Sequence, residues 1–513
     1  MSDRRAESGE VRVFAEYQRD FSEEADVVVV GSGPCGAVAA YELAAAGKRV
    51  VLLEEGPPFT PADFELEGSL SMARTMREGG LRFTMGTVMP TMQAIALGGG
   101  SLVNSAMCNR TPEFRFGEWA QEADLSRTTR RDLEPHYDAI AEAIGIATTP
   151  DEVQGPRNLL FRDGCKNLGY AAESCPRNVV HCRGSGECFT GCRARAKQSM
   201  DISYVPASIE LGARVLTSVR VEEIRSNGRR VTGVAGRVVA PFSGAPGPRF
   251  QVNAKAVVLA AGVLATPLLL QRSGNLANTS GQVGEQLQFH PGTSVLGVFP
   301  DPVDPIFGAT QGYQCLHFLR EGFKLETLWA PPGVLAVRMP GLGHHFKQQL
   351  LDMRFASVFD AIASCHRSRG RVRERGKSLQ PNMRWNFHPD DAAILARSVY
   401  TMAEIFFAAG ARKIMPGVAN HPDEMHSLAE AEALRTRPPR ARDMVCASTH
   451  VFGTARMHGD PRRGVVDEDL KAHDLDNLYV VDTSVFPLSP AVNPMFTGMA
   501  LARRSALALA DRV

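Results

Sequence analysis

The first clear pattern of hydrophobic and polar positions lies between residues 26 and 56. Asp26–Val30 is a short run rich in β-branched residues, and it leads into the glycine-rich sequence 31–36. An Ala-rich stretch follows and ends at Gly47, and a second apolar run covers Arg49–Leu53. Short apolar runs on either side of a helical stretch are typical of buried parallel strands. The segment therefore predicts a strand–turn–helix–strand unit.

Further elements are expected along the chain from similar signals. Pro at the first turn of a helix and Asp at its cap mark helix starts, and β-branched runs mark strands. We expect strands at 215–221, 231–239 and 256–260, and helices at 131–144, from about 266, and from Asp390 or Asp391 to 410. The fold class is α/β, with a Rossmann-like nucleotide-binding domain whose parallel sheet is discontinuous in sequence, and an inserted α+β domain.

Composition and charge exclude several classes of protein. The 513 residues are 44% hydrophobic and 22% charged, which is ordinary for a globular chain and too apolar for disorder. The net charge of +1 argues against a nucleic-acid partner. The longest near-apolar run, Ala256–Leu270, is too short to cross a bilayer and contains Gly262 and Pro267. Residues 1–20 are expected to be a polar lead-in without a signal peptide, so the cytoplasm is the expected location.

The glycine-rich turn at residues 31–36 points to a nucleotide. Gly31 permits a tight turn out of the strand, Gly33 lets the backbone approach a pyrophosphate, and Gly36 lets the helix pack closely on the sheet. Glu54 follows the second strand, where a carboxylate accepts hydrogen bonds from ribose hydroxyls and rejects a 2′-phosphate. This disfavours NADP but does not separate FAD from NAD.

Motifs near the C-terminus resolve that choice through a resemblance. The segments are His450–Met457, Gly464–Asp467, Asn477–Pro487 and Val492–Thr497, and earlier segments in the same order are Leu97–Asn104, Ala261–Gly274 and Val283–Pro291. Together they resemble the glucose–methanol–choline (GMC) family of FAD-dependent oxidoreductases, and the Val-Asn-Pro ending is most similar to the sterol and long-chain alcohol oxidases. The middle third shows only weak similarity.

The resemblance implies catalytic roles for two residues. His450 takes the position of the family's catalytic histidine, and Asn493 takes that of its partner. Alcohol oxidation needs a base for the hydroxyl proton, and a neutral imidazole suits that task. An Asn amide can donate to the substrate oxygen, while the hydride passes to flavin N5. His290, His458 and His473 are expected to serve packing.

The resemblance also implies a set of residues that contact the cofactor. Asp482 corresponds to an acidic residue beside the pyrophosphate or ribityl chain. Val103 stands where members with a covalent flavin carry histidine, so the FAD is expected to be non-covalent. The expected contacts are Gly31, Gly33, Pro34, Gly36, Glu54, Gly99, Ser101, Asn104, Val219, Ala261, Asp482, Asn493, Pro494 and Met495.

The resemblance gives expected domain boundaries. Residues 21–120, 200–295 and 441–513 are expected to form three parts of the FAD-binding domain, the last of them with the catalytic residues. Residues 121–199 are expected to form a cysteine-rich segment that covers the flavin, and residues 296–440 the substrate-binding domain.

Four cysteines lie close together in the sequence, at positions 175, 182, 188 and 192. The spacing of Cys182, Cys188 and Cys192 is similar to the [3Fe–4S]-binding segment of distantly related flavoprotein dehydrogenase subunits, and three thiolates suit such a cluster. All four could instead form a tetrahedral zinc site. Free thiols in a flavin-covering loop are the third alternative, and the one we favour, so no metal site is assigned.

The function expected from these observations is oxidation of a hydrophobic or secondary alcohol to the carbonyl, with oxygen or another acceptor taking the electrons. A lyase or isomerase with a structural FAD, an electron-transfer subunit and an NAD enzyme are the alternatives. Some aromatic side chains of the inserted domain should line an apolar pocket, although core packing explains most of them equally well. The basic run 366–377 is expected to be a solvated loop.

Overall fold

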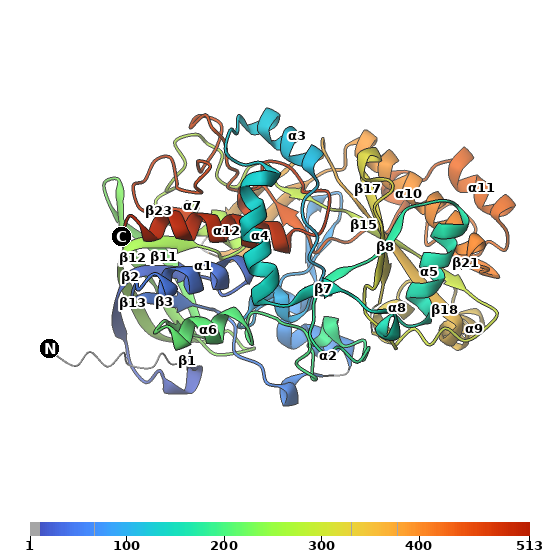
Figure 1. Cartoon of the computed structure of the whole chain (residues 1–513), viewed down its shortest axis with the longest axis horizontal. Helices are drawn as coiled ribbons and strands as arrows, with labels where there is room; N and C mark the ends of the chain where they lie inside the picture. The colour runs from blue at the N-terminus through green and yellow to red at the C-terminus, as the bar shows by residue number, and fades with distance from the viewer. Residues whose placement is uncertain (1–10, 66, 330, 377) are drawn as a thin grey trace.

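The computed structural model describes residues 11–65, 67–329, 331–376 and 378–513. The first half of the polar lead-in expected at residues 1–20, up to residue 10, and Lys377 of the basic run lie outside the described residues. Figure 1 shows two sheets toward opposite ends of the long axis of the molecule, with helices around both. This arrangement confirms the α/β class.

The larger sheet contains eight strands among the described residues and is built from segments far apart in the sequence. Its order is β1-β10-β3-β2-β13-β12-β11, and β23 also pairs with β13. The pairs from β1 to β13, and β13 with β23, are parallel, whereas β13, β12 and β11 are antiparallel. The bounds are β1 Val11–Arg12, β2 Phe21–Val30, β3 Val50–Leu53, β10 Arg214–Leu216, β11 Val219–Asn227, β12 Arg230–Val239, β13 Pro246–Leu259 and β23 Leu478–Val480.

Helices cover this sheet and extend its core. Helix α1 (Pro34–Ala45) packs against α12 (Met495–Ala510) and α6 (Tyr204–Glu210), and α12 packs against α4 (Arg130–Ala143). Residues Val27–Val29 of β2 and Leu52 of β3 are fully buried, as expected for strands covered on both faces. Helix α7 (Ala265–Arg272) follows β13 directly.

The second sheet has six strands among the described residues, in the order β21-β15-β18-β17-β16-β8. All of its pairs are antiparallel. One face lies against α5 (Pro156–Asn167) and α10 (Pro389–Ala408), and there the rings of Phe359 and Phe406 stack at 3.8 Å. The strands are β8 Ala172–Ser174, β15 Gly292–Val298, β16 Tyr313–Cys315, β17 Phe323–Leu328, β18 Ala356–Ala363 and β21 Lys413–Met415.

Smaller elements connect the two sheets. The further helices are α2 Gly68–Thr75, α3 Glu113–Ala123, α8 Pro332–Ala336, α9 Gly343–Asp352 and α11 Leu428–Thr436. The further strands are β4 Arg82–Phe83, β5 Met85–Gly86, β6 Pro90–Thr91, β7 Ile146–Thr148, β9 Pro176–Asn178, β14 Gln288–Phe289, β19 Gly370–Arg375, β20 Ser378–Trp385 and β22 Val451–Phe452. In the described part of the chain, every helix falls short of the length and apolarity needed to cross a membrane.

Three local predictions differ from the structure. The expected strand at 215–221 is two strands, β10 and β11, because Ser218 between them adopts a left-handed φ of 59° that breaks the extended run. The expected loop at 366–377 contains β19, which pairs with β20. Part of the expected lead-in, Val11–Arg12, is strand β1. The domain boundaries stay predictions, although β15 runs across the one at 295/296.

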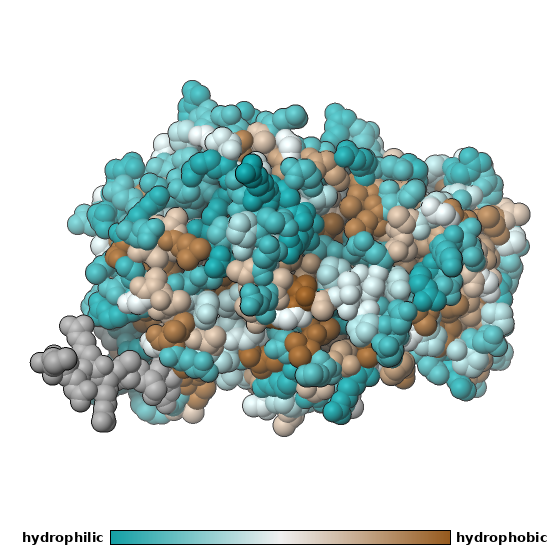
Figure 2. All heavy atoms as spheres, in the orientation of Figure 1, coloured by the Kyte–Doolittle hydropathy of each residue, from teal (hydrophilic) through white to brown (hydrophobic). Residues whose placement is uncertain are grey.

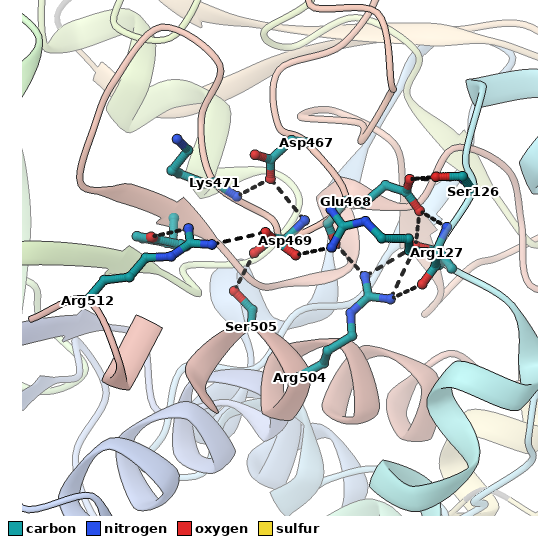
Figure 3. A network of polar contacts seen from close by, with 11 residues as sticks. Ser126, Arg127, Asp467, Glu468, Asp469, Lys471, Arg504, Ser505 and Arg512 are labelled. Carbon is teal, nitrogen blue, oxygen red and sulfur yellow. Dashed lines mark hydrogen bonds and ion pairs between the residues drawn. The ribbon is translucent and has the colours of Figure 1, made fainter. Parts of the chain in front are cut away.

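A network of charged groups holds α12 in place (Figure 3). The Glu468 carboxylate accepts hydrogen bonds from the backbone N–H groups of Ser126 and Arg127, at 2.9 and 2.7 Å. Arg504 of α12 donates to the carbonyl oxygens of Arg127 and Glu468, and the Ser505 hydroxyl donates to the carbonyl of Asp469. The helix is thereby tied to two loops. The face of the molecule in Figure 2 is mainly hydrophilic, with separate smaller apolar areas.

Candidate active site

The glycine turn at residues 31–36 is tightly packed at Gly31 and Gly36 and open at Gly33. Gly31 has φ of 103°, and a Cβ atom there would overlap the carbonyl of Ala260. A Cβ atom at Gly36 would overlap the carbonyl oxygen of Gly31, so the helix start lies tightly against the turn. A Cβ at Gly33 would meet nothing within 4 Å, and Gly33 caps α1 without a side-chain hydrogen bond. The N–H groups at the start of α1, where Pro34 is the first residue, are therefore available to an anion.

Glu54 lies beside this turn, as predicted. Its carboxylate accepts hydrogen bonds from the N–H and hydroxyl of Ser32, at 3.0 and 2.6 Å, and from the N–H of Gly56 at 2.8 Å. Burial raises the pKa of Glu54, and these hydrogen bonds oppose the shift. A carboxylate can accept about four hydrogen bonds, so one site is left for a ribose hydroxyl. Val219 donates its N–H to the carbonyl of Glu54 at 2.9 Å, which places it at the same strand end.

The loop at residues 98–104 lies over the turn. A Cβ at Gly99 would come within 2.7 Å of the Cα of Gly33, and Gly98 donates to the Ser32 hydroxyl at 2.9 Å. The Ser101 hydroxyl donates to the Gly98 carbonyl and accepts from the N–H of Met200, so it holds the loop itself. Asn104 contacts the sulfur of Met495 through its amide nitrogen at 3.0 Å. The loop thus joins the glycine turn to the start of α12.

Asp482 and Ala261 lie where β13 ends. The Asp482 carboxylate accepts hydrogen bonds from the N–H groups of Gly262 and Ser484, both at 2.9 Å, and from the Thr266 hydroxyl at 2.5 Å. Burial raises its pKa. A Cβ at Gly31 would lie 3.3 Å from the Cα of Ala261, so this strand end adjoins the glycine turn. Asp482 therefore joins the segments that surround the turn.

A short antiparallel ladder brings His450 next to His290. Strand β22 follows His450 directly and pairs with β14, which precedes His290. The two Nδ1 atoms are 3.2 Å apart, and the Nε2 of His290 forms a hydrogen bond with the Ser489 hydroxyl. The expectation of a packing role for His290 did not anticipate this contact. His458 and His473 instead form a pair of their own, with a ring nitrogen of His473 3.0 Å from the His458 carbonyl.

Burial controls the protonation of His450. It lowers the pKa of His450 to about 4, with a smaller opposing effect of Glu326 and a further lowering by Lys324. The pKa of His290 also lies well below its usual value because of burial and the neighbouring His450. Both imidazoles are therefore neutral at pH 7, and His450 is able to accept a proton.

Asn493 is held from the second sheet. Its Oδ1 accepts hydrogen bonds from the Lys324 ammonium at 2.6 Å and from the Asn109 amide at 3.0 Å. Pro494 caps α12 without a side-chain hydrogen bond, and Met495 is the first residue of that helix. Lys324 pairs with Glu326 at 2.7 Å, so the ion pair contacts Asn493 directly and also acts electrostatically on His450.

Asn109, Lys324 and Glu326 were not predicted from the sequence. The only signal of the last two was a Lys and a Glu at alternate positions of the β-strand sequence 323–328, which ordinarily indicates a solvated face. The structure buries both, with 0% and 2% of the residues exposed. The aromatic side chains expected in an apolar pocket lie mainly in packed cores, since Tyr313, Phe318, Phe323 and Trp329 are buried.

Cys182, Cys188 and Cys192 line one pocket, but it is small. Its volume is about 10 Å³, room for about one water molecule. Arg177 donates to the Cys188 sulfur at 3.1 Å, and Lys197 lines the same pocket. Cys175 lies at the junction of β8 and β9 and is fully buried. Across the residues that the structure describes, no group of three or more His, Cys, Asp or Glu side chains is arranged to hold a metal ion.

Comparisons with known proteins identify the family of the chain. The family model of the GMC oxidoreductases matches residues 26–292 and 366–502 in its N-terminal and C-terminal parts. An uncharacterized GMC-type oxidoreductase of Mycobacterium tuberculosis is 33% identical over 495 residues, which cover 95% of this chain and 75% of that protein.

Two further proteins extend the comparison. A long-chain-alcohol oxidase of Arabidopsis thaliana is 27% identical over 93% of this chain and 66% of its own length. The crystal structure of pyridoxine 4-oxidase from Mesorbium loti has the same fold, with a TM-score of 0.72, 20% identity, and coverage of 94% of this chain and 98% of that one. The chain belongs to the glucose–methanol–choline family of FAD-dependent oxidoreductases, enzymes that act on alcohols.

Proposed function

We propose that this enzyme oxidises the hydroxyl of a hydrophobic or secondary alcohol to a carbonyl, with His450 as the base. The bound flavin, held non-covalently, supplies the acceptor for the hydride. The observation that carries the proposal is the buried, neutral imidazole of His450, which is held against His290 and feels the charges of the same ion pair that contacts Asn493. A base and an amide donor around one point are what alcohol oxidation requires of the protein.

The contact between the two histidines is compatible with a tautomer in which Nε2 of His450 is the base. Between two Nδ1 atoms, one must carry the proton and donate it to the other. If His450 donates from Nδ1, its Nε2 carries a lone pair and can accept the hydroxyl proton. His290 then carries its proton on Nε2 and donates it to the Ser489 hydroxyl. A serine hydroxyl can donate as well as accept, so Ser489 permits this tautomer without imposing it, and we propose that it is the active one.

The residues proposed to hold FAD fit its chemistry. The open space at Gly33 and the free N–H groups at the start of α1 suit a pyrophosphate, and Glu54 retains one acceptor site for a ribose hydroxyl. The start of α12, with Pro494 and Met495, presents further unpaired N–H groups. Val103 is buried and has no side chain able to form a covalent link to the flavin.

An alcohol with an apolar body is the proposed substrate because of the relatives, and the face of the second sheet that carries Lys324 and Glu326 is apolar farther along the strands. Leu328, Val358 and Leu296 pair across three strands on the face that carries Lys324 and Glu326. Leu296 and Val358 are buried in one small apolar cluster, and Leu328 packs against it. The long-chain-alcohol oxidases among the relatives are consistent with such a substrate and with oxygen as the acceptor. Production of hydrogen peroxide during turnover distinguishes oxygen from another acceptor.

Free thiols are the state that we propose for the cysteine-rich segment. A pocket of about 10 Å³ has no room for a cluster of several iron and sulfur atoms, whereas Arg177 already contacts the Cys188 sulfur. Iron and acid-labile sulfide in the purified protein would instead favour the alternative of an electron-transfer subunit.

Anaerobic reduction of the flavin tests the proposed function. We expect flavin absorbance to bleach when an alcohol from a graded panel is added to the wild-type enzyme. His450→Ala should slow this bleaching by at least ~10²-fold while FAD stays bound, which is the scale of a lost general base. A wild-type enzyme that no alcohol reduces would favour a lyase or isomerase with a structural FAD, and a wild-type rate in His450→Ala would place the base elsewhere.

A further inference from the structure

Lys324 is a fully buried cation at the junction of the second sheet and the C-terminal segment. None of its surface is exposed, and its ammonium is 2.7 Å from the Glu326 carboxylate and 2.6 Å from Asn493 Oδ1. Removing two charges from water costs several kcal/mol per ion, and a hydrophobic pair of similar volume is often as stable. Stability therefore gives no sufficient reason for this pair, and its position needs another explanation.

The strand fixes where Lys324 points. Lys324 and Glu326 stand at alternate positions of β17, so both side chains leave the same face of the sheet. The neighbouring residues Phe323 and Leu325 leave the opposite face and are buried in the core that includes α5 and α10. The register of β17 on β18, with Lys324 opposite Ile362 and Glu326 opposite Asp360, holds the pair in place.

The partners of Asn493 determine the orientation of its amide group. A lysine ammonium can only donate, so the atom that faces Lys324 must be the oxygen. Asn109 donates to the same oxygen, and its own oxygen accepts from Gln314 at 2.8 Å, which turns its nitrogen toward Asn493. Two donors thus hold Asn493 Oδ1. Its Nδ2 forms no hydrogen bond with any described residue and is left for another acceptor.

We propose that Lys324 is a positioning residue: by holding Asn493 Oδ1, it directs Nδ2 toward the oxygen of the alcohol. This inference rests on the proposed function. Without Lys324, only the neutral Asn109 amide would hold this oxygen, and we expect that weaker hold to let the amide rotate by 180° about its last side-chain bond. It would then present an oxygen to the substrate oxygen, where two acceptors repel each other. The inserted domain would then supply an essential part of the catalytic geometry as well as binding the substrate.

The ion pair also acts on His450, which provides a second measurement. His450 contacts His290 from the neighbouring ladder, and Glu326 and Lys324 of β17 act on it electrostatically. Glu326 raises the pKa of His450 and Lys324 lowers it. Loss of Lys324 alone leaves the Glu326 carboxylate unbalanced, so the pKa of His450 should rise. The acid limb of the kcat/KM profile should then move to higher pH.

Three variants and one control test the inference. Lys324→Met removes the donor, and Lys324→Arg keeps one, because a guanidinium also only donates. Asn493→Asp keeps the contact with Lys324 but has no N–H to offer. Lys413→Met is the matched control, since Lys413 is also on the second sheet and pairs with Glu424 and Asp352 away from the site.

We expect Lys324→Met and Asn493→Asp to slow flavin reduction by about 10²-fold with little change in KM, as for loss of one donor to a reacting oxygen. Lys324→Arg should recover most of the rate, and Lys413→Met should keep it. In Lys324→Met the acid limb should move upward. A wild-type rate in Lys324→Met or Asn493→Asp overturns the inference, and so do equal losses in Lys324→Met and Lys324→Arg with an unmoved acid limb.

Atomic-resolution crystal structures add a readout that needs no turnover. Asn493 should keep Oδ1 toward position 324 in the wild type and in Lys324→Arg, and rotate in Lys324→Met. An amide that stays in place in Lys324→Met counts against the inference, whether or not an alcohol has been found. A wild-type enzyme that no alcohol reduces counts against the proposed function alone. If Lys324→Met does not fold, Lys324→Arg and Asn493→Asp decide.

Discussion

Two glycines of one turn should respond to alanine in opposite ways. Gly33 and Gly36 belong to the same motif, but only Gly33 has open space where a Cβ would stand. Its φ of −60° and ψ of 177° are also open to any residue. Gly33→Ala should leave the flavin-free protein as stable as the wild type, or about 0.5 kcal/mol more stable, because alanine restricts the unfolded chain.

Gly36→Ala should destabilise the flavin-free protein. The new Cβ would overlap the carbonyl oxygen of Gly31 and stand 2.9 Å from the Cβ of Ala260. The Gly31 carbonyl is backbone and cannot rotate away, so we expect the upper end of overpacking costs, about 3 kcal/mol. The gain in helix propensity from glycine to alanine returns about 1 kcal/mol. The net loss in the free energy of unfolding should be about 2 kcal/mol.

The assay separates binding from folding. Each protein is stripped of flavin, its thermal unfolding is followed by circular dichroism, and FAD is then titrated back by fluorescence. Gly33→Ala should bind FAD at least 10-fold more weakly, because its methyl group points where the pyrophosphate is proposed to lie. Full FAD affinity in Gly33→Ala would refute the assignment of the turn, and an unstable flavin-free Gly33→Ala would refute the geometry.

Two further predictions concern the active site and the cysteine-rich segment. Because burial lowers the pKa of His450 to about 4, the base is neutral above that pH, and kcat/KM should be constant from neutral pH down to about 5 and fall below it. The pKa of the same histidine is about 6.5 in the unfolded chain, so the unfolded state takes up the proton first as the pH falls. Denaturant unfolding should therefore show a loss of stability between pH 6.5 and pH 4. Lys197 donates to the carbonyl oxygens of Leu102, Asn104 and Cys188, at 2.7, 2.9 and 2.7 Å. Lys197→Met should therefore cost about 3 kcal/mol of stability through three unsatisfied acceptors, and it should release FAD more readily. A variant with an unchanged unfolding temperature would contradict this role.

The local parts of the site could be predicted from the sequence. The turn at Gly31, Gly33 and Gly36 was placed correctly because strand, turn and helix follow one another within a few residues. The break at Ser218 was not, because a run of β-branched residues carries no mark of the single left-handed residue that divides β10 from β11.

Contacts between distant segments were beyond prediction from the pattern. Lys324 and Asn493 are 169 positions apart, and a charged residue in a strand ordinarily faces water. His290 was interpreted as a packing residue because its neighbour in space, His450, is 160 positions away. Only the pairing of β14 with β22 brings those two rings together.

The position of Lys324 limits how this enzyme can be re-engineered. Exchange of the whole second sheet with that of a relative is an obvious way to change which alcohol is accepted. The exchange would also replace the ammonium that holds Asn493, a residue contributed by the C-terminal segment. Chimaeras of this kind should therefore keep β17 from the parent that provides the C-terminal segment, or lose turnover together with the old preference.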